Sequence, residues 1–104
     1  MFARVTIFQG APDSVDGPIR FAVQRASEGG GDLPGFLGLF DLSDRDSGHS
    51  VIVTFWTTKE ALDASAAFAR SATESVAEEG AEHVISIRDY EVGHHLLSPD
   101  FPTS

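Results

Sequence analysis

The sequence lacks cysteine and asparagine altogether, and it contains no run of lysine or arginine. Without cysteine the chain can form no disulfide, no thiolate nucleophile and no cysteine-ligated zinc site. Its 16 acidic residues outweigh 7 basic ones, which gives a formal net charge of −9. Because nucleic-acid phosphates and anionic lipids repel a chain of this charge, we expect neither nucleic acid nor membranes among its partners.

Long apolar runs are also missing, and none reaches the length of a membrane span. Residues 1–5 indicate a strand rather than the charged start of a signal peptide, so we expect a cytoplasmic protein. A chain of 104 residues is typical of one domain. We assign residues 1–95 to that domain and 96–104 to a C-terminal tail whose composition is compatible with disorder.

The stretch Val51–Glu79 organises the rest of the chain. Val51–Trp56 is an almost unbroken run of β-branched and aromatic residues, which predicts a strand covered on both faces. Thr57 with Glu60 three positions later forms a capping-box pattern, which predicts the start of a helix. Small and apolar residues then recur at steps of three and four and predict a helix face packed on the strand: Ala61, Leu62, Ser65, Phe68, Ala69, Ala72 and Val76.

The remaining patterns predict three further strands, over Phe2–Phe8, Phe36–Leu42 and His83–Val92. A helical periodicity covers roughly 14–28, and polar residues 43–48 predict a hairpin loop. Gly29–Gly31 indicates a plain connection, because a phosphate-binding glycine loop needs a helix directly behind it and a strand follows here. The resulting β-α-β-β-α-β order predicts an α+β, ferredoxin-like fold, a four-stranded antiparallel sheet with two helices on one face.

Two helices can cover only one face of such a sheet. Since the strand Val51–Trp56 is apolar on both faces, we expect the other face to be an interface. The simplest partner is a second copy, so the sequence predicts a symmetric homodimer with its two sheets stacked face to face, a dimeric α+β barrel.

Two segments carry a resemblance to a known family. Leu33–Gly38 has a Pro-Gly-Phe entry to its strand, and Val51–Leu62 has a strand-end Trp followed by Thr-x-Glu-Ala. Together with the polar hairpin between them, they resemble the antibiotic biosynthesis monooxygenase (ABM) domain of the dimeric α+β barrel superfamily. The resemblance implies oxygenation without a cofactor of a small aromatic substrate of hydroquinone or anthrone type, in a pocket between sheet and helices.

The superfamily also includes haem degraders, which use an Asn on the first strand and a His in the second helix. This chain has no Asn and no His between Thr57 and Glu82, so haem degradation is not expected. The monooxygenases carry an Asn on the third strand where this sequence has Ile52. The alternative from another class is therefore a non-catalytic dimer of the same fold that binds a small apolar ligand or serves a stress-related role.

By the resemblance, Trp56 lines the pocket and takes part in catalysis, with Thr54 as its strand neighbour and Phe68 reaching from the facing helix. The competing interpretation of Trp56 is a core residue. His83 is an available base, because histidine titrates near neutrality. Tyr90 either donates into the pocket or lies at the interface.

Arg4 has two interpretations, an anchor for an anionic substrate or an ion pair with Asp89 or Glu91 of the fourth strand, and the pairing is favoured. His94 and His95 are neighbours on an extended segment, so their side chains point in opposite directions. This pair is a poor chelate, and we expect no metal site.

Overall fold

The computed structural model describes residues 1–10, 33–67, 70 and 82–102, and at 82 and 83 it describes the backbone alone. The elements in chain order are β1 (Phe2–Gly10), β2 (Phe36–Asp44), β3 (His49–Trp56), α2 (Lys59–Ala64) and β4 (Glu82–Glu91). The helix predicted over roughly 14–28 and the later part of the second helix lie outside the described residues. None of the described helices has the length and apolar character needed to cross a bilayer.

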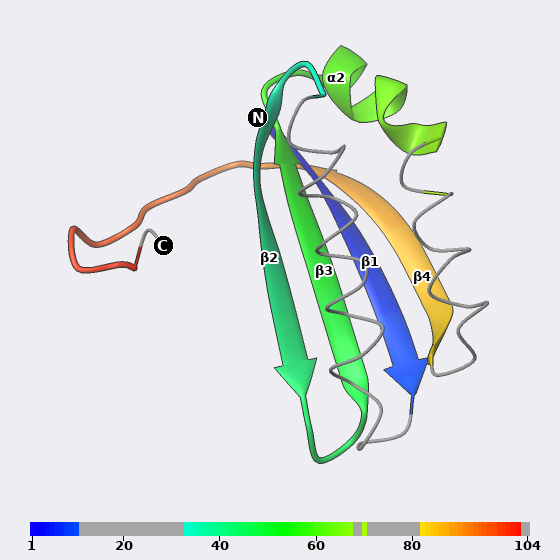
Figure 1. The fold of residues 1–104 in the computed structure, drawn as a ribbon. Coiled ribbons are helices and arrows are strands. Elements are labelled where there is room, and N and C mark those ends of the chain that lie inside the picture. The colour runs from blue at the N-terminus through cyan, green and yellow to red at the C-terminus, as the bar shows by residue number, and fades with distance from the viewer. Residues whose placement is uncertain (11–32, 68–69, 71–81, 103–104) are drawn as a thin grey trace.

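The strands form one sheet in the order β2-β3-β1-β4, and every neighbouring pair is antiparallel (Figure 1). β1 and β3 are central, while β2 and β4 form the edges. This is the strand order of the ferredoxin-like arrangement, in which a hairpin joins the second and third strands. The predicted four-stranded antiparallel sheet is therefore confirmed, with each strand close to its predicted position.

The hairpin between β2 and β3 is tighter than predicted. β2 continues to Asp44, so it enters the region 43–48 that the sequence assigns to a loop, and β3 begins at His49, directly after that region. The Asp44 carboxylate accepts the backbone N–H of Asp46 at 3.0 Å, and the Gly48 N–H donates to the Asp44 carbonyl at 2.9 Å. Gly48 adopts a φ of 77°, a region that glycine enters without strain, and this closes the turn early.

The second helix begins one residue later than the capping-box prediction. Thr58, not Thr57, is the N-cap, and its hydroxyl oxygen accepts the backbone N–H of Ala61 at 3.1 Å. The N–H of Thr57 is already engaged, because it donates to the Gly35 carbonyl at 2.8 Å. That bond ties the end of β3 to the start of β2 and fixes where the chain can turn into α2.

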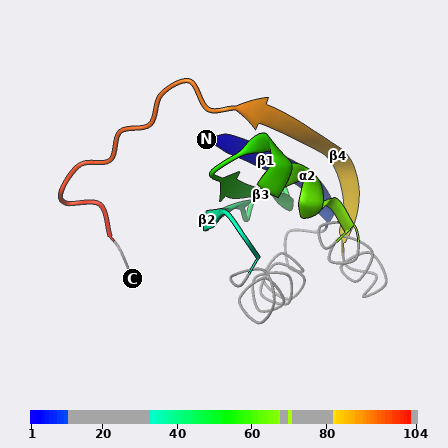
Figure 2. The same cartoon turned by 90° about the horizontal axis from the view of Figure 1, so that it is seen from above.

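α2 lies on one face of the sheet, called the inner face below, at the end where β1 begins and β3 ends (Figures 1 and 2). Further along this inner face, buried Phe8 packs against Ile52 and Val84. Simple alternation along β4 would place Val84 on the same face as Tyr90, but a register shift prevents this. The pairing of β1 with β4 shifts register between Ile7 and Phe8, and the bulge puts Val84 opposite Phe8.

The opposite face, called the outer face below, is apolar. By register and alternation it carries side chains from all four strands: Ala3, Val5, Ile7, Phe40, Leu42, Val51, Val53, Phe55, Arg88 and Tyr90. Phe40, Leu42 and Tyr90 are exposed in the subunit. Phe40 packs edge-on against Phe55, with ring centroids 5.5 Å apart. This is the two-sided apolar sheet that the sequence predicts.

Candidate functional site

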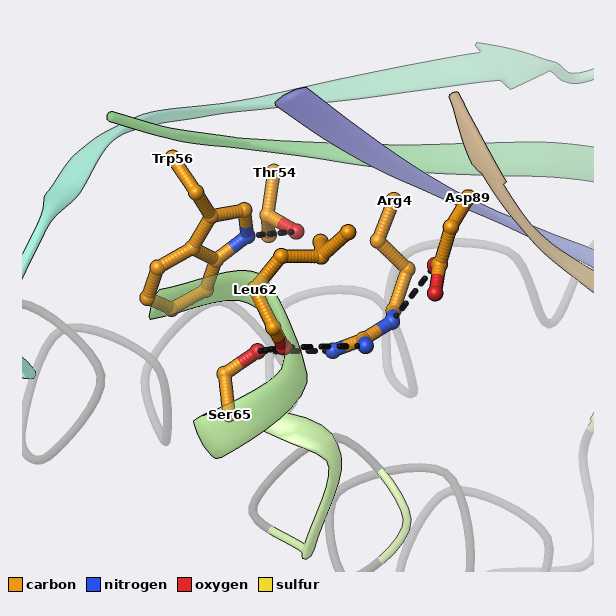
Figure 3. Close-up of polar contacts among 6 residues, drawn as sticks. All are labelled: Arg4, Thr54, Trp56, Leu62, Ser65 and Asp89. Carbon is orange, nitrogen blue, oxygen red and sulfur yellow. Dashed lines mark hydrogen bonds and ion pairs between the residues drawn. The ribbon is translucent and has the colours of Figure 1, made fainter. Parts of the chain in front are cut away.

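The candidate site lies between α2 and the inner face, where β1, β3 and β4 present polar groups toward the helix (Figure 3). We call it the inner site. β1 contributes Arg4, and β3 contributes Thr54 and Trp56. The helix region contributes Leu62 and Ser65, and Asp89 of β4 lies at the edge of the site. The register explains the gathering, because Arg4 stands opposite Thr54 on one side and opposite Asp89 on the other.

Arg4 is the charged centre of the inner site and is only 6% exposed. Its Nε donates to Asp89 Oδ1 at 3.0 Å, and its Nη1 donates to Ser65 Oγ at 2.7 Å. Nη2 donates to the Leu62 carbonyl at 3.1 Å. The ion pair with Asp89 confirms the pairing that the sequence favours for Arg4. Each guanidinium nitrogen uses one N–H in these bonds, and Nη1 and Nη2 each carry a second hydrogen.

Ser65 links Arg4 to the end of α2. Its hydroxyl accepts from Arg4 and donates to the Leu62 carbonyl at 2.6 Å, so one buried oxygen serves both roles. The Leu62 carbonyl lies in the last turn of α2 and also accepts the Ser65 N–H at 3.2 Å, and a cation beside this end of a helix is favourable. Arg4 therefore fixes the last turn of α2 onto β1.

Trp56 occupies the other side of the inner site and is 3% exposed. Its indole Nε1–H donates to Thr54 Oγ1 at 3.1 Å, and Phe36 packs edge-on against it at a centroid distance of 5.3 Å. Leu62, which is also buried, lies between the indole and the Arg4 guanidinium (Figure 3). In this conformation the indole has its polar group satisfied and its faces covered, which is how a core tryptophan is held.

The structure brings Arg4, Thr54 and Trp56 together, but it does not place Tyr90 with them. Tyr90 stands opposite Ala3 in the register, one residue from Asp89, so its side chain points to the outer face, where it is 49% exposed. Phe68 lies outside the described residues.

Of His83 only the backbone is described, in β4 opposite Gln9. The sequence analysis missed the polar role of Ser65, which it assigned only to the apolar helix face. A serine on that face could have signalled a partner for a buried cation. In the part of the chain that the structure describes, no group of three or more His, Asp or Glu side chains is placed to hold a metal ion.

No protein-family model and no curated protein matches the sequence. Solved structures do match over nearly the whole chain. A Deinococcus radiodurans protein, provisionally named an antibiotic biosynthesis monooxygenase, aligns with a TM-score of 0.72 and 17% identity over 94% of this chain and 98% of its own. The chain has the ABM fold.

Two further ABM-fold structures differ in their chemistry. SnoaB from Streptomyces nogalater, a cofactor-independent oxygenase, aligns with a TM-score of 0.63 and 19% identity, covering 93% of this chain and 97% of its own. The haem degrader MhuD from Mycobacterium tuberculosis aligns with a TM-score of 0.58 and 20% identity, covering 92% of this chain and 99% of its own. At such identities the likeness shows the fold, and one ABM fold carries both activities.

Proposed function

We propose that the protein is a cofactor-independent oxygenase for a small electron-rich aromatic substrate of the anthrone or hydroquinone class, bound at the inner site. The observation that carries the proposal is the guanidinium of Arg4, which is buried between sheet and helix and separated from Trp56 by Leu62. A substrate that reacts directly with O₂ must first become an anion, and a fixed cation in an apolar site stabilises that anion. The shared fold with the cofactor-independent oxygenase SnoaB supports the same chemistry.

The reaction on an anthrone balances with O₂ as the sole co-reactant. A base removes a proton from the methylene carbon between the two aryl rings, and the resulting carbanion gives one electron to O₂. The substrate radical and superoxide join through a new C–O bond to form a peroxide. Cleavage of its O–O bond with loss of one water leaves a carbonyl at that carbon. The carbon is oxidised, O₂ is reduced, and one of its oxygen atoms leaves as water.

The roles at the inner site follow from its geometry. The unused hydrogens on Nη1 and Nη2 of Arg4 can donate to the substrate oxygen that carries the negative charge. Trp56 supplies an aromatic wall after Leu62 or Phe36 moves, because the closed inner site covers the indole. His83, the base that the sequence analysis names, stands opposite Gln9, six residues along β4 from Asp89. At about 3.3 Å per strand residue it lies about 20 Å from the inner site, so another group must supply the base.

The second candidate is a non-catalytic ligand-binding dimer of the same fold. The observation in its favour is the internal satisfaction of the inner site: Trp56 bonds Thr54, and Arg4 bonds Asp89, Ser65 and Leu62. Haem degradation is not proposed, because the sequence has no histidine between Thr57 and Glu82.

Either candidate acts as a homodimer in our proposal, with the outer faces of two copies packed together. The support is the aromatic row on this face, in which Phe101 lies against Phe40 at a centroid distance of 5.8 Å and Phe40 lies against Phe55. An apolar surface of this kind on a small chain is typical of an interface. A closed two-fold contact covers both copies at once.

Oxygen uptake with a panel of anthrones and hydroquinones distinguishes the two candidates. We expect uptake above the autoxidation rate with the wild-type chain, a large loss in Trp56→Phe, and no loss in Lys59→Gln, which changes an exposed side chain of α2. Uptake equal to autoxidation across the panel, while a substrate analogue still binds, would support the non-catalytic candidate. Haem titration without a shift of the Soret band would exclude haem as the bound ligand.

A further inference from the structure

The carboxylate of Asp89 reaches the inner site from β4 (Figure 3). Its Oδ1 accepts the Nε–H of Arg4 at 3.0 Å. In the part of the chain that the structure describes, the second oxygen, Oδ2, has no hydrogen bond or ion pair. Asp89 therefore presents one oxygen that Arg4 holds in place and one that is free to accept a proton.

Other acidic residues close to α2 and β4 lack this arrangement. Asp63 pairs with Lys59 on the exposed side of α2, at 3.1 Å. Glu91 lies two residues beyond Asp89, so it shares the same face of β4, and it is exposed. Among the described carboxylates, Asp89 is the one that bonds Arg4.

We propose that Asp89 is the general base of the inner site and that its Oδ2 removes the proton that turns a neutral aromatic substrate into an anion. The inference rests on the oxygenase function proposed above. For an anthrone, a methylene C–H bond breaks, the proton moves to Oδ2, and the electron pair stays on the substrate and delocalises onto its carbonyl oxygen. After O₂ has added, the carboxylic acid returns the proton to the peroxide anion, which regenerates the carboxylate.

The ion pair makes this proton transfer favourable in a buried place. Before the transfer, the Asp89 carboxylate is the counter-ion of Arg4. After it, Asp89 is neutral and the substrate anion takes its place, so the net charge of the site does not change and the buried guanidinium keeps a counter-ion. Aspartate acts as a base toward a weakly acidic carbon where fixed donors stabilise the anion that forms.

The exposure of the pair allows the transfer to be measured. The Asp89 side chain is 43% exposed, whereas that of Arg4 is 7% exposed. A proton held by Asp89 therefore exchanges with water. In D₂O the base returns deuterium to the substrate, and without O₂ the reaction stops at the anion. Anaerobic deuterium incorporation thus reports proton transfer alone.

The experiment follows deuterium entry into the methylene group of anthrone by proton NMR, in anaerobic D₂O. We expect the wild-type chain to exceed the buffer rate, and Asp89→Asn, which keeps an acceptor oxygen for Arg4 Nε, to lower the enzymatic rate at least about a hundredfold. Glu91→Gln is the matched control and should leave the rate unchanged. Because Trp56 is the only tryptophan, its quenching by anthraquinone, which has no acidic hydrogen, should show that Asp89→Asn still binds the ring system.

Oxygen uptake measured in parallel separates the two proposals. Wild-type uptake above autoxidation that persists in Asp89→Asn would overturn the base and leave the oxygenase standing. Wild-type deuterium exchange without uptake in air would leave the base standing and remove the oxygenase. Wild-type exchange at the buffer rate, or equal exchange in Asp89→Asn, would overturn the base.

A second variant serves where circular dichroism shows that Asp89→Asn is not folded. Asp89→Ser in formate receives a small carboxylate that replaces both the counter-ion of Arg4 and the base. We expect exchange to rise with formate concentration and not with chloride at the same ionic strength. The absence of rescue by formate in the folded variant, with exchange at the wild-type rate, would overturn the assignment.

Discussion

Arg4 and Asp89 join a central strand to an edge strand through a salt bridge in which Arg4 Nε lies 3.0 Å from Asp89 Oδ1. The two ends of this bridge differ, because the Arg4 side chain is buried while that of Asp89 is half-exposed. Removing Asp89 would leave the buried Arg4 guanidinium without its counter-ion, whereas removing Arg4 would leave a carboxylate that water can solvate. Arg4 also holds Ser65 and the Leu62 carbonyl, so the same side chain connects β1 to β4 and to α2.

Arg4→Met should lower the free energy of unfolding by about 2–4 kcal/mol, because it removes three hydrogen bonds of a buried guanidinium, to Asp89, Ser65 and the Leu62 carbonyl. Urea denaturation followed by circular dichroism measures the change. Lys59→Met is the control, since the Lys59–Asp63 pair is exposed and its loss should cost less than about 1 kcal/mol. Equal effects from the two substitutions would show that the Arg4 contacts contribute no more than a surface ion pair.

Gly35→Ala should destabilise the protein by about 2 kcal/mol or more, since two penalties act at that position. Gly35 has a φ of 81°, and an added Cβ would lie 2.6 Å from the Ala61 Cβ and 2.7 Å from Thr57 Oγ1. Gly38→Ala is the matched control, because an added Cβ there meets nothing within 4 Å. Thermal denaturation of both variants gives the comparison, and similar melting temperatures would contradict the close approach of α2 to this turn.

Thr58→Ala should lower the free energy of unfolding by about 1 kcal/mol through loss of the N-cap of α2. Thr57→Ala should have the smaller effect, because the Thr57 backbone, and not its side chain, makes the bond to Gly35. Urea titration of the two variants side by side separates the alternatives. A larger effect at Thr57 would restore the capping box predicted from the sequence.

Asp44 should give the hairpin a pH-dependent contribution to stability. Hydrogen bonds from the Asp46 backbone, then from the Ser47 side chain and backbone, hold the pKa of the Asp44 carboxyl below its usual value. A pKa lowered on folding stabilises the protein above the unfolded pKa of about 3.9, and the contribution disappears as the pH falls through the lower folded value.

Asp44→Asn should therefore be less stable than wild type at pH 7, and the difference should shrink as the pH falls below about 4. Urea denaturation at both pH values measures it. A difference that stays constant with pH would show that the carboxylate charge is not what the turn recognises.

The sheet was predictable because its strands are long apolar runs whose order admits one common arrangement, and the pairing of Arg4 with Asp89 followed from that order. Alternation also places Asp89 and Tyr90 on opposite faces, so that pairing already separates Tyr90 from the inner site. Two local details of the backbone could not be predicted from the sequence. The bulge beside Phe8 and the engagement of the Thr57 N–H by Gly35 depend on backbone contacts between distant segments, which no local pattern encodes.

The inner site was predictable in part. Trp56 and Thr54 lie two residues apart on one strand, so their common face follows from the pleat. Ser65 and the Leu62 carbonyl became partners of Arg4 only because α2 crosses the sheet directly above that side chain. The crossing position of a helix depends on tertiary packing.

In the proposed homodimer a second copy covers the outer face of the sheet. Light scattering on the size-exclusion eluate of the full chain tests this homodimer most directly. We predict a particle with twice the 11.1 kDa mass of one chain at micromolar concentration. A stable particle of 11.1 kDa under the same conditions would leave Phe40 and Leu42 open to water, and it would contradict the homodimer.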